Sequence, residues 1–282
     1  MGRIARSWEL VKQSFAILKS DKELMLLPIA SAISCVVVSV VILAGGALAF
    51  LPEIKTSLAT NARWQPNDPR MWVCLFIFYL ANYFVIVFFN VALVTAASSR
   101  LAGGQATIND GLQAAWERKV RIFEWALLAA TVGILLRMME ERMSWIGRLV
   151  VRLIGVAWTL ASYFVVPVLA AEDLGPVEAL KRSAHVFRQT WGEKVVGGFS
   201  FGLIFMLLAL PGIALPLLGA ALSPAGMVVG SVSMVLYWLL LGVVSAATEG
   251  IFTAALYRYA ITKQVSAGFR PENFSMAWQP KR

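Results

Sequence analysis

The sequence is poor in charged residues. Only 15% of its 282 residues are charged, whereas 59% are hydrophobic, and the mean hydropathy is +0.72. Soluble domains contain about 25% charged residues, so this chain has too little polar surface to cover a globule in water. The composition therefore excludes an ordinary soluble domain and predicts a single integral membrane domain.

Residues that perform chemistry are equally scarce. The chain has one histidine, His185, and two cysteines, Cys35 and Cys74, which both lie in apolar runs. A lone histidine without a carboxylate or thiolate cluster is a poor metal ligand or general base, and two such cysteines form no disulfide framework. Glycine-rich phosphate loops, paired carboxylates and a Ser/His/Asp arrangement are also missing. We therefore expect no catalytic residue, no metal, no cofactor and no enzymatic activity.

Long uncharged runs are the main feature of the chain. Three of them, near 24–51, 71–98 and 153–171, meet the ~20 residues that cross a bilayer. The run 195–248 would form a helix of ~80 Å at ~1.5 Å per residue, against a ~30 Å hydrocarbon core. It must therefore be a hairpin, and Ser223-Pro224-Ala225-Gly226 supplies the turn.

A further span at 122–139 is harder to assign, because only twelve uncharged residues separate Glu124 from Arg137. Loop charge favours a full crossing: with six spans, 18 of the 25 Lys and Arg residues lie on the side of the N-terminus, which is then cytoplasmic. Five spans would break this pattern. A re-entrant pair over 122–171 would preserve it and stays open as the alternative. The expected fold class is all-α, a polytopic transmembrane helix bundle. It comprises one transmembrane domain over 1–265 and a cytoplasmic tail over 266–282. The expected spans lie near 24–51, 71–98, 122–139, 153–171, 195–222 and 226–249.

Short amphipathic helices are predicted before three of the spans, near 4–19, 108–121 and 176–191, because apolar residues recur there at three- and four-residue steps. Thr107 to Asp110 is a good start for the second of them. The segment Ser20 to Glu23 has the spacing of a capping box and is expected to start the first span. These connectors fit the cytoplasmic membrane interface.

The connectors carry basic residues, and the whole chain has a net charge of +9. In a membrane protein this balance indicates contact with anionic lipid at the cytoplasmic face, and no nucleic acid partner is expected. The alternative is that the connectors are structural elbows that cover the underside of the bundle. The expected lipid contacts are Lys12, Lys19, Lys181, Arg182 and Arg188.

Two segments resemble a prokaryotic family of membrane proteins of unknown function. They are residues 7–28 (SWELVKQSFAILKSDKELMLLP) and residues 166–176 (VPVLAAEDLGP), the latter continuing into 179–183 (ALKRS) and 190–193 (TWGE). The pattern of connector and span is loosely similar to the membrane domain found beside some glycerophosphodiester phosphodiesterases. Their catalytic domain is missing here, so the resemblance implies a six-span membrane protein and no enzymatic activity.

Polar residues within spans are the best candidates for function, because burying them costs free energy unless they are paired. Asn82 and Asn90 lie in the second span, about 80° apart around a helix. Glu249 lies near the inner end of the last span. The three are candidates to line a pathway, and the alternative for the asparagines is a hydrogen bond between helices.

Small residues in the last two spans predict close helix packing. Gly242, Ala246, Gly250 and Ala254 recur at every fourth position, and Gly198 and Gly202 repeat this spacing in the fifth span. The stripe serves either an internal contact, a homo-oligomer or another membrane protein. Three prolines are expected to bend their helices, namely Pro167, Pro211 and Pro216.

Two functions remain. The leading hypothesis is a non-enzymatic protein of a prokaryotic inner membrane that acts through lipid or protein contacts at the cytoplasmic face. The rival is a permease or channel for a small solute or lipid, in which Asn82, Asn90 and Glu249 work.

Overall fold

The computed structural model describes residues 3–52, 55–56, 69–191, 196–266 and 268–269. Every regular element in these ranges is helical, which confirms the all-α prediction. Six helical segments are long and apolar enough to cross a membrane, and they correspond to the six expected spans. They are Lys22–Ala49, Arg70–Leu101, Lys119–Arg142, Trp145–Ala171, Ile204–Leu222 and Pro224–Thr262.

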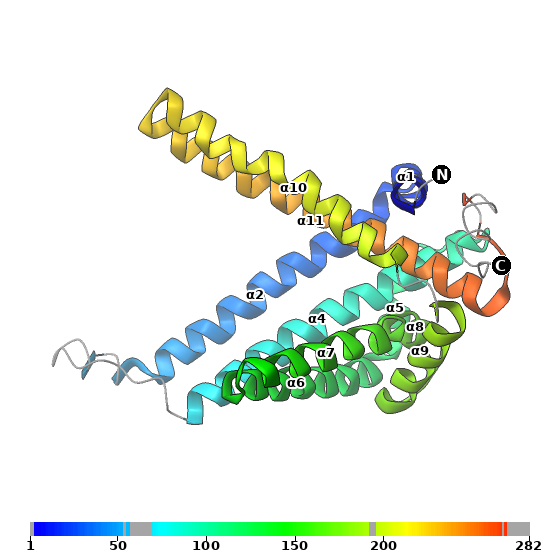
Figure 1. The fold of residues 1–282 in the computed structure, drawn as a ribbon, viewed down its shortest axis with the longest axis horizontal. Helices are drawn as coiled ribbons and strands as arrows, with labels where there is room; N and C mark the ends of the chain where they lie inside the picture. Colours follow the sequence, from blue (N-terminus) through cyan, green and yellow to red (C-terminus); the bar gives the residue numbers. More distant parts are fainter. Residues whose placement is uncertain (1–2, 53–54, 57–68, 192–195, 267, 270–282) are drawn as a thin grey trace.

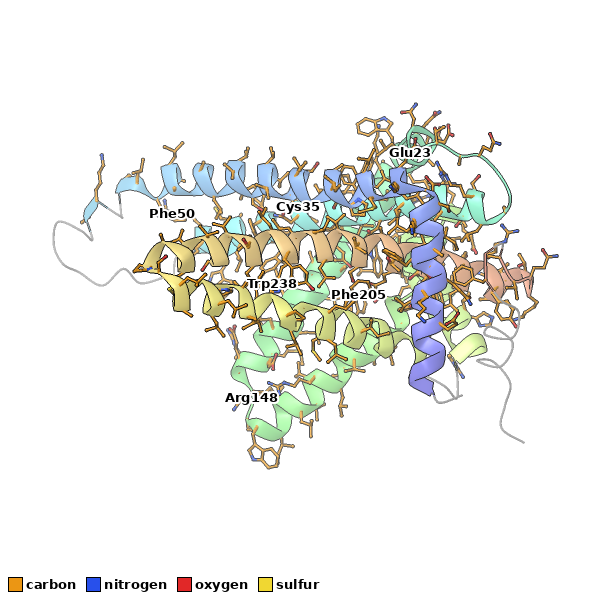
Figure 2. The ribbon with its side chains drawn as sticks, turned by 90° about the horizontal axis from the view of Figure 1, so that it is seen from above. Glu23, Cys35, Phe50, Arg148, Phe205 and Trp238 are labelled. Atoms are coloured by element: carbon orange, nitrogen blue, oxygen red, sulfur yellow. The ribbon has the colours of Figure 1, made fainter. Side chains whose placement is uncertain are left out.

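The chain begins with helix α1 (Arg3–Ser20), followed by a short 3₁₀ turn, η1 (Lys22–Met25), and the long helix α2 (Leu26–Ala49). Figure 1 shows α1 end-on, and Figure 2 shows it running at right angles to α2, α10 and α11. In Figure 2, Glu23 and Phe50 mark the two ends of the first span. Helix α1 therefore lies across one end of the bundle, as an interfacial helix would.

The predicted capping box at Ser20 to Glu23 is wrong. Asp21 precedes η1, and its side chain caps no backbone N–H. The Ser20 hydroxyl donates to the Ile17 carbonyl instead. Asp21 and Glu23 both pair with Arg100, which lies far away in the sequence. The acidic side chains of this segment therefore form long-range ion pairs instead of a local capping box.

Helix α4 (Pro69–Leu101) leads through a short loop to α5 (Ile108–Glu117) and then α6 (Lys119–Arg142). The predicted start of α5 is confirmed, because Thr107 and Asp110 form a reciprocal capping box. Helix α6 is continuous over 24 residues, about 36 Å at ~1.5 Å per residue. This exceeds a ~30 Å hydrocarbon core, although only twelve uncharged residues lie between Glu124 and Arg137.

The fourth span consists of two helices, α7 (Trp145–Ser162) and α8 (Val165–Ala171), and α9 (Pro176–Trp191) follows. Trp125 of α6 stacks on Trp158 of α7 with ring centroids 5.8 Å apart. Since α6 and the α7–α8 pair both have the length to cross, they favour two full spans over the re-entrant alternative.

Helices α10 (Val196–Leu222) and α11 (Pro224–Thr262) form the predicted hairpin. The Ser223 hydroxyl accepts a hydrogen bond from the Gly226 N–H at the start of α11. Helix α11 continues well beyond residue 249, where the sequence analysis ends the last span. Its extra turns are stabilised by packing against α1, α4 and α9.

The buried core lies at the end of the bundle that carries both chain termini, which we call the terminal end (Figure 1). Leu24, Val91, Ile122, Leu169 and Ile251 are all fully buried there. Away from it, the α10–α11 hairpin diverges from the other helices, and both this hairpin and α2 expose apolar side chains. Such surfaces suit lipid chains rather than water.

Candidate functional site

The site that combines polar groups with space is a cleft of about 240 Å³ between α4, the α7–α8 junction and α11. The two sequence-predicted pathway residues Asn90 and Glu249 both line it. The complete lining is Asn90, Val94, Tyr163, Val166, Ala246, Glu249, Gly250 and Thr253.

The cleft lies where α11 separates from its neighbours. The buried residues of α11 are concentrated between Ala247 and Ala260, and the helix is mostly exposed before Ala246. Figure 1 shows α11 leaving α4 and α7 beyond this point. Asn90 lies eleven residues before the Leu101 end of α4, or about 17 Å at ~1.5 Å per residue. Asn90 and Glu249 therefore lie inside two of the six candidate membrane spans and away from the helix ends.

Proline placement explains how Tyr163 enters the lining. Pro167 has no N–H to donate to the Tyr163 carbonyl, four residues earlier. The helix breaks at Tyr163 and Phe164, between α7 and α8, where the sequence analysis expects a bend from Pro167. The Phe164 N–H, which the break removes from the regular ladder, donates to the Ser183 hydroxyl of α9 at 2.9 Å.

Ser183→Ala should therefore destabilise the protein. It leaves the buried Phe164 N–H without an acceptor, at a cost of about 1–3 kcal/mol. Thermal unfolding in detergent would measure the loss. Thr131→Ala is the matched control, because the exposed Thr131 hydroxyl only bonds the Leu127 carbonyl of its own helix. Equal midpoints for the two variants would contradict this role for Ser183.

Two of the polar lining residues have no protein partner. Tyr163 shares a hydrogen bond with Thr253. Neither Asn90 nor Glu249 makes a hydrogen bond or ion pair with any other residue in the part of the chain that the structure describes. Polar groups within membrane spans are costly unless they are paired, so a carboxylate and an amide that line the same cleft make it the candidate binding site.

Asn82 lies apart from this cleft. Its amide oxygen accepts a hydrogen bond from the Ser39 hydroxyl of α2 at 3.2 Å, and its amide nitrogen donates to the Phe78 carbonyl. The sequence analysis left two alternatives for Asn82, a place in a pathway or a hydrogen bond between helices. In the structure Asn82 forms the hydrogen bond between helices. Asn82 and Asn90 thus do not share a pathway.

A polar network lies nearer the terminal end. The Arg182 guanidinium donates to Glu172 at 3.0 Å, and the Tyr257 hydroxyl donates to the same carboxylate oxygen at 2.8 Å. The hydrogen bond to Glu172 raises the pKa of Arg182 above its usual value. Arg121 links Asp173 and Glu124 in a similar way. These pairs hold the segment after α8 against α6, α9 and α11.

The expected lipid-contact residues are therefore not equivalent. Arg182 is paired with Glu172, and the Lys12 Nζ lies 3.8 Å from Oε2 of Glu9. Lys19, Lys181 and Arg188 are exposed on α1 and α9. The segments Lys12-Gln13-Ser14 of α1 and Lys181-Arg182-Ser183 of α9 are similar in one respect, because both lysines are exposed and both serines are completely buried.

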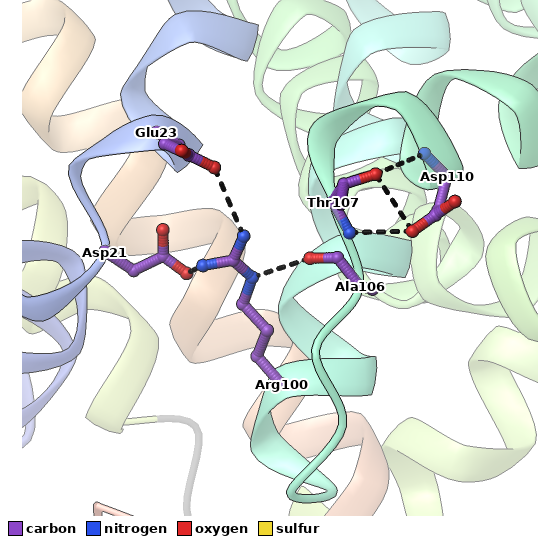
Figure 3. A network of polar contacts seen from close by, with 6 residues as sticks. All are labelled: Asp21, Glu23, Arg100, Ala106, Thr107 and Asp110. Atoms are coloured by element: carbon purple, nitrogen blue, oxygen red, sulfur yellow. Dashed lines mark hydrogen bonds and ion pairs between the residues drawn. The ribbon is translucent and has the colours of Figure 1, made fainter.

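A second cluster joins four segments at the terminal end (Figure 3). Arg100 pairs with Asp21 and with Glu23, and its Nε donates to the Ala106 carbonyl at 2.8 Å. Asp110 lies next to this loop, and hydrogen bonds from the Thr107 backbone and hydroxyl hold its pKa below the usual value. The cluster ties the start of α2 to the α4–α5 loop.

The predicted small-residue positions divide into two groups. On α11, Gly250 lies against Leu93 of α4 and Ala254 is completely buried. Gly242 and Gly202 face open space, and Ala246 lines the cleft. Gly198 belongs to α10, but its surroundings lie outside the described residues, as does most of the tail 266–282.

Other glycines carry the close helix approach in the hairpin. A Cβ added at Gly219 would overlap the Gly226 carbonyl, and one added at Gly230 would overlap the Leu215 carbonyl. Around Pro211, the Leu208 and Ala209 carbonyls accept hydrogen bonds from Tyr237 and Trp238 of α11. These aromatic donors satisfy backbone near a proline that the membrane would otherwise leave exposed.

Sequence reasoning missed Tyr163 and Thr253 in the cleft, and Arg100 in the terminal cluster. Two signals were present for the cleft: Thr253 follows Glu249 by one helical turn, and Tyr163 precedes Pro167 by one turn. No local signal connects Arg100 with Asp21. Among the described residues there is no group of three or more His, Cys, Asp or Glu side chains that could hold a metal ion.

Comparison with known families assigns the chain to a family whose function is unknown. A family model described as "Family of unknown function (DUF6159)" matches residues 70–269, well over half of the chain. The chain belongs to this family. The matched region includes α4 to α11 and therefore the whole cleft. It also includes the segment 166–193, in which the sequence resembles a membrane-protein family of unknown function. The segment 7–28 lies outside it. No curated protein and no solved structure matches the chain.

Proposed function

We propose that this membrane protein binds a small polar ligand in the cleft and lets it pass between the membrane interior and one or both membrane surfaces. The observation that carries this proposal is that Glu249 and Asn90, from two different candidate membrane spans, line one cleft and have no hydrogen-bond or ion-pair partner among the described residues. A ligand with polar atoms would supply the hydrogen bonds that the protein leaves open.

The shape of the bundle supports exchange. The cleft is lined by residues of α4 and α11, and the α10–α11 hairpin diverges from α4 away from the terminal end (Figure 1). We propose that a ligand enters between these two helices. The tightly packed core at the terminal end would hold the helices together while the distal parts move. On this ground we favour the rival hypothesis, a permease or channel, over the contact hypothesis, and we propose Asn90 and Glu249 rather than Asn82 as its working residues.

Cysteine accessibility tests the proposal. Ala246→Cys, made after Cys35 and Cys74 are replaced by alanine, places one thiol in the cleft. The thiolate is the nucleophile that attacks a thiol reagent, and it forms poorly in apolar surroundings. We therefore expect a membrane-impermeant reagent to label this thiol if the cleft holds water. Val37→Cys is the control, since Val37 is exposed on the apolar surface of α2, eleven residues from its start.

Labelling in right-side-out and inverted vesicles distinguishes the outcomes. Fast reaction of Ala246→Cys from both sides supports a passage, and fast reaction from one side supports a binding site open to that side. A reaction as slow as that of Val37→Cys from both sides would mean a dry bundle and would contradict the proposal.

Contact with anionic lipid is the second candidate. It is favoured by α1, which lies across the terminal end of the bundle with Lys19 exposed, and by the exposed Lys181 and Arg188 of α9. Exposed cations on interfacial helices attract anionic headgroups, each contributing about 1 kcal/mol. In this case the basic surface would carry the function, and the cleft would be dispensable.

A further inference from the structure

We propose that the cleft takes a cationic group that donates hydrogen bonds, a primary ammonium or a guanidinium, carried by a free amine or by a lipid headgroup. This inference rests on the proposed function and names the chemical class of its ligand. The first argument is charge. Glu249 contributes a carboxylate, and none of the eight lining residues is Lys, Arg or His.

Among the described residues, no basic side chain forms an ion pair with Glu249. In the polar network described above, the Arg182 guanidinium is bound to Glu172, which also accepts a hydrogen bond from Tyr257. Tyr257 is two helical turns from Glu249 on α11, about 12 Å at ~1.5 Å per residue. A cation in the cleft would therefore meet the Glu249 carboxylate without competition from a basic lining residue.

The second argument is hydrogen bonding. Each oxygen that faces the cleft from Glu249, Asn90, Tyr163 and Thr253 can accept a hydrogen bond, and ionised Glu249 can only accept. Tyr163 and Thr253 already share one hydrogen bond, which uses one of their two donors. The acceptor oxygens that remain in the cleft favour a ligand with several N–H donors over a ligand that only accepts hydrogen bonds.

The third argument is size and polarity. A volume of about 240 Å³ corresponds to roughly eight water molecules at ~30 Å³ each. This suits a small amine or the headgroup of a lipid and excludes a bulky solute. Val94, Val166 and Ala246 make the rest of the wall apolar, as a short aliphatic stem next to the cationic group requires.

Two thiol reagents of similar size and opposite charge test the inference. They are the trimethylammonium-ethyl and the sulfonato-ethyl methanethiosulfonates, applied to Ala246→Cys. The exposed position Gln264→Cys supplies their rate ratio in open water. Relative to this ratio, we expect the cationic reagent to be favoured at Ala246→Cys by about tenfold, which corresponds to ~1.4 kcal/mol.

Substitutions then assign the preference to the carboxylate. Glu249→Gln, which keeps the shape of the side chain, should abolish the preference, and Asn90→Asp should increase it. A preference no greater than at Gln264→Cys, or one that survives Glu249→Gln, would overturn the cationic assignment. Fast labelling by both reagents would in that case still support a hydrated cleft, so the two proposals fail separately.

Protection experiments distinguish the two sources of the cation. If the ligand is a free amine, ethanolamine or guanidinium in solution should slow labelling, whereas tetramethylammonium, which has no N–H donor, should not. If it is a lipid headgroup, labelling should be slower in vesicles of phosphatidylethanolamine and phosphatidylglycerol than in vesicles where phosphatidylcholine replaces the ethanolamine lipid. Absence of protection in both arms would overturn the proposal of a hydrogen-bonding cation.

Discussion

Arg100→Ala should unfold the protein at a clearly lower temperature than the wild type. Arg100 pairs with Asp21 and with Glu23, and it also donates to the Ala106 carbonyl. The Asp21 side chain is only 13% exposed and that of Arg100 25%. Removing the guanidinium would leave a poorly solvated carboxylate without its partner.

The expected loss lies between two limits. Breaking a fully buried ion pair costs about 3–5 kcal/mol, and breaking an exposed one costs about 0–1 kcal/mol. Since this cluster is partly buried, we expect about 2–3 kcal/mol, read from thermal unfolding in detergent. Arg100→Lys keeps the charge but lacks the planar fork of donors, so it should fall between the wild type and Arg100→Ala.

Arg137→Ala is the control for this prediction. Arg137 pairs with Glu141 one turn away and contacts the Tyr79 hydroxyl, and its side chain is 64% exposed. Its removal should cost about 1 kcal/mol or less. If Arg100→Ala is no more destabilising than Arg137→Ala, the cluster at the terminal end does not hold α2 to the α4–α5 loop.

Gly230→Ala is expected to have the second large effect. A Cβ at this position would meet the carbonyl oxygen of Leu215 and the Cα of Pro216, both backbone atoms of α10 that no rotamer change can move away. The two helices would have to separate, and such overpacking costs about 1–3 kcal/mol. The measurement is again the midpoint of thermal unfolding.

Gly242→Ala provides a matched control on the same helix. Nothing lies within 4 Å of the Cβ that it would add. Alanine has a higher helix propensity than glycine by about 1 kcal/mol, so this variant should be neutral or stabilising. Unchanged stability in Gly230→Ala would show that the helices do not approach as closely as the hairpin geometry requires. A loss of stability in Gly242→Ala would show that the space around this position is filled.

Local patterns in the sequence predict the helices well. The uncharged run 195–248 is too long for one span, and the turn at Ser223 to Gly226 is where the structure places it. The capping box at Thr107 is also where the local residues indicate it. Such features depend on residues within a few positions of each other, so the sequence alone is enough to find them. Loop charge further supported a helix over 122–139, which the structure extends to Lys119–Arg142.

Local patterns fail where a distant residue decides. The segment at Ser20 to Glu23 has the composition of a capping box, but Arg100 binds both of its acids. Glu249 marks the end of an uncharged run, yet α11 continues to Thr262 because its later turns pack against α1, α4 and α9. In both cases tertiary contacts outweigh a local preference of a fraction of a kcal/mol to about one kcal/mol.

By itself, the sequence determined that the chain is a bundle of long apolar helices with short basic connectors, and that Asn82, Asn90 and Glu249 are polar groups within it. Composition and periodicity are properties of short stretches, and the membrane imposes helix on such stretches. Only the tertiary structure decided which polar groups meet. It paired Asn82 with Ser39 and brought Asn90 and Glu249 to one cleft. The physical reason is that the rotation and crossing of packed helices depend on contacts between distant residues, such as Gly250 against Leu93, which no local pattern encodes.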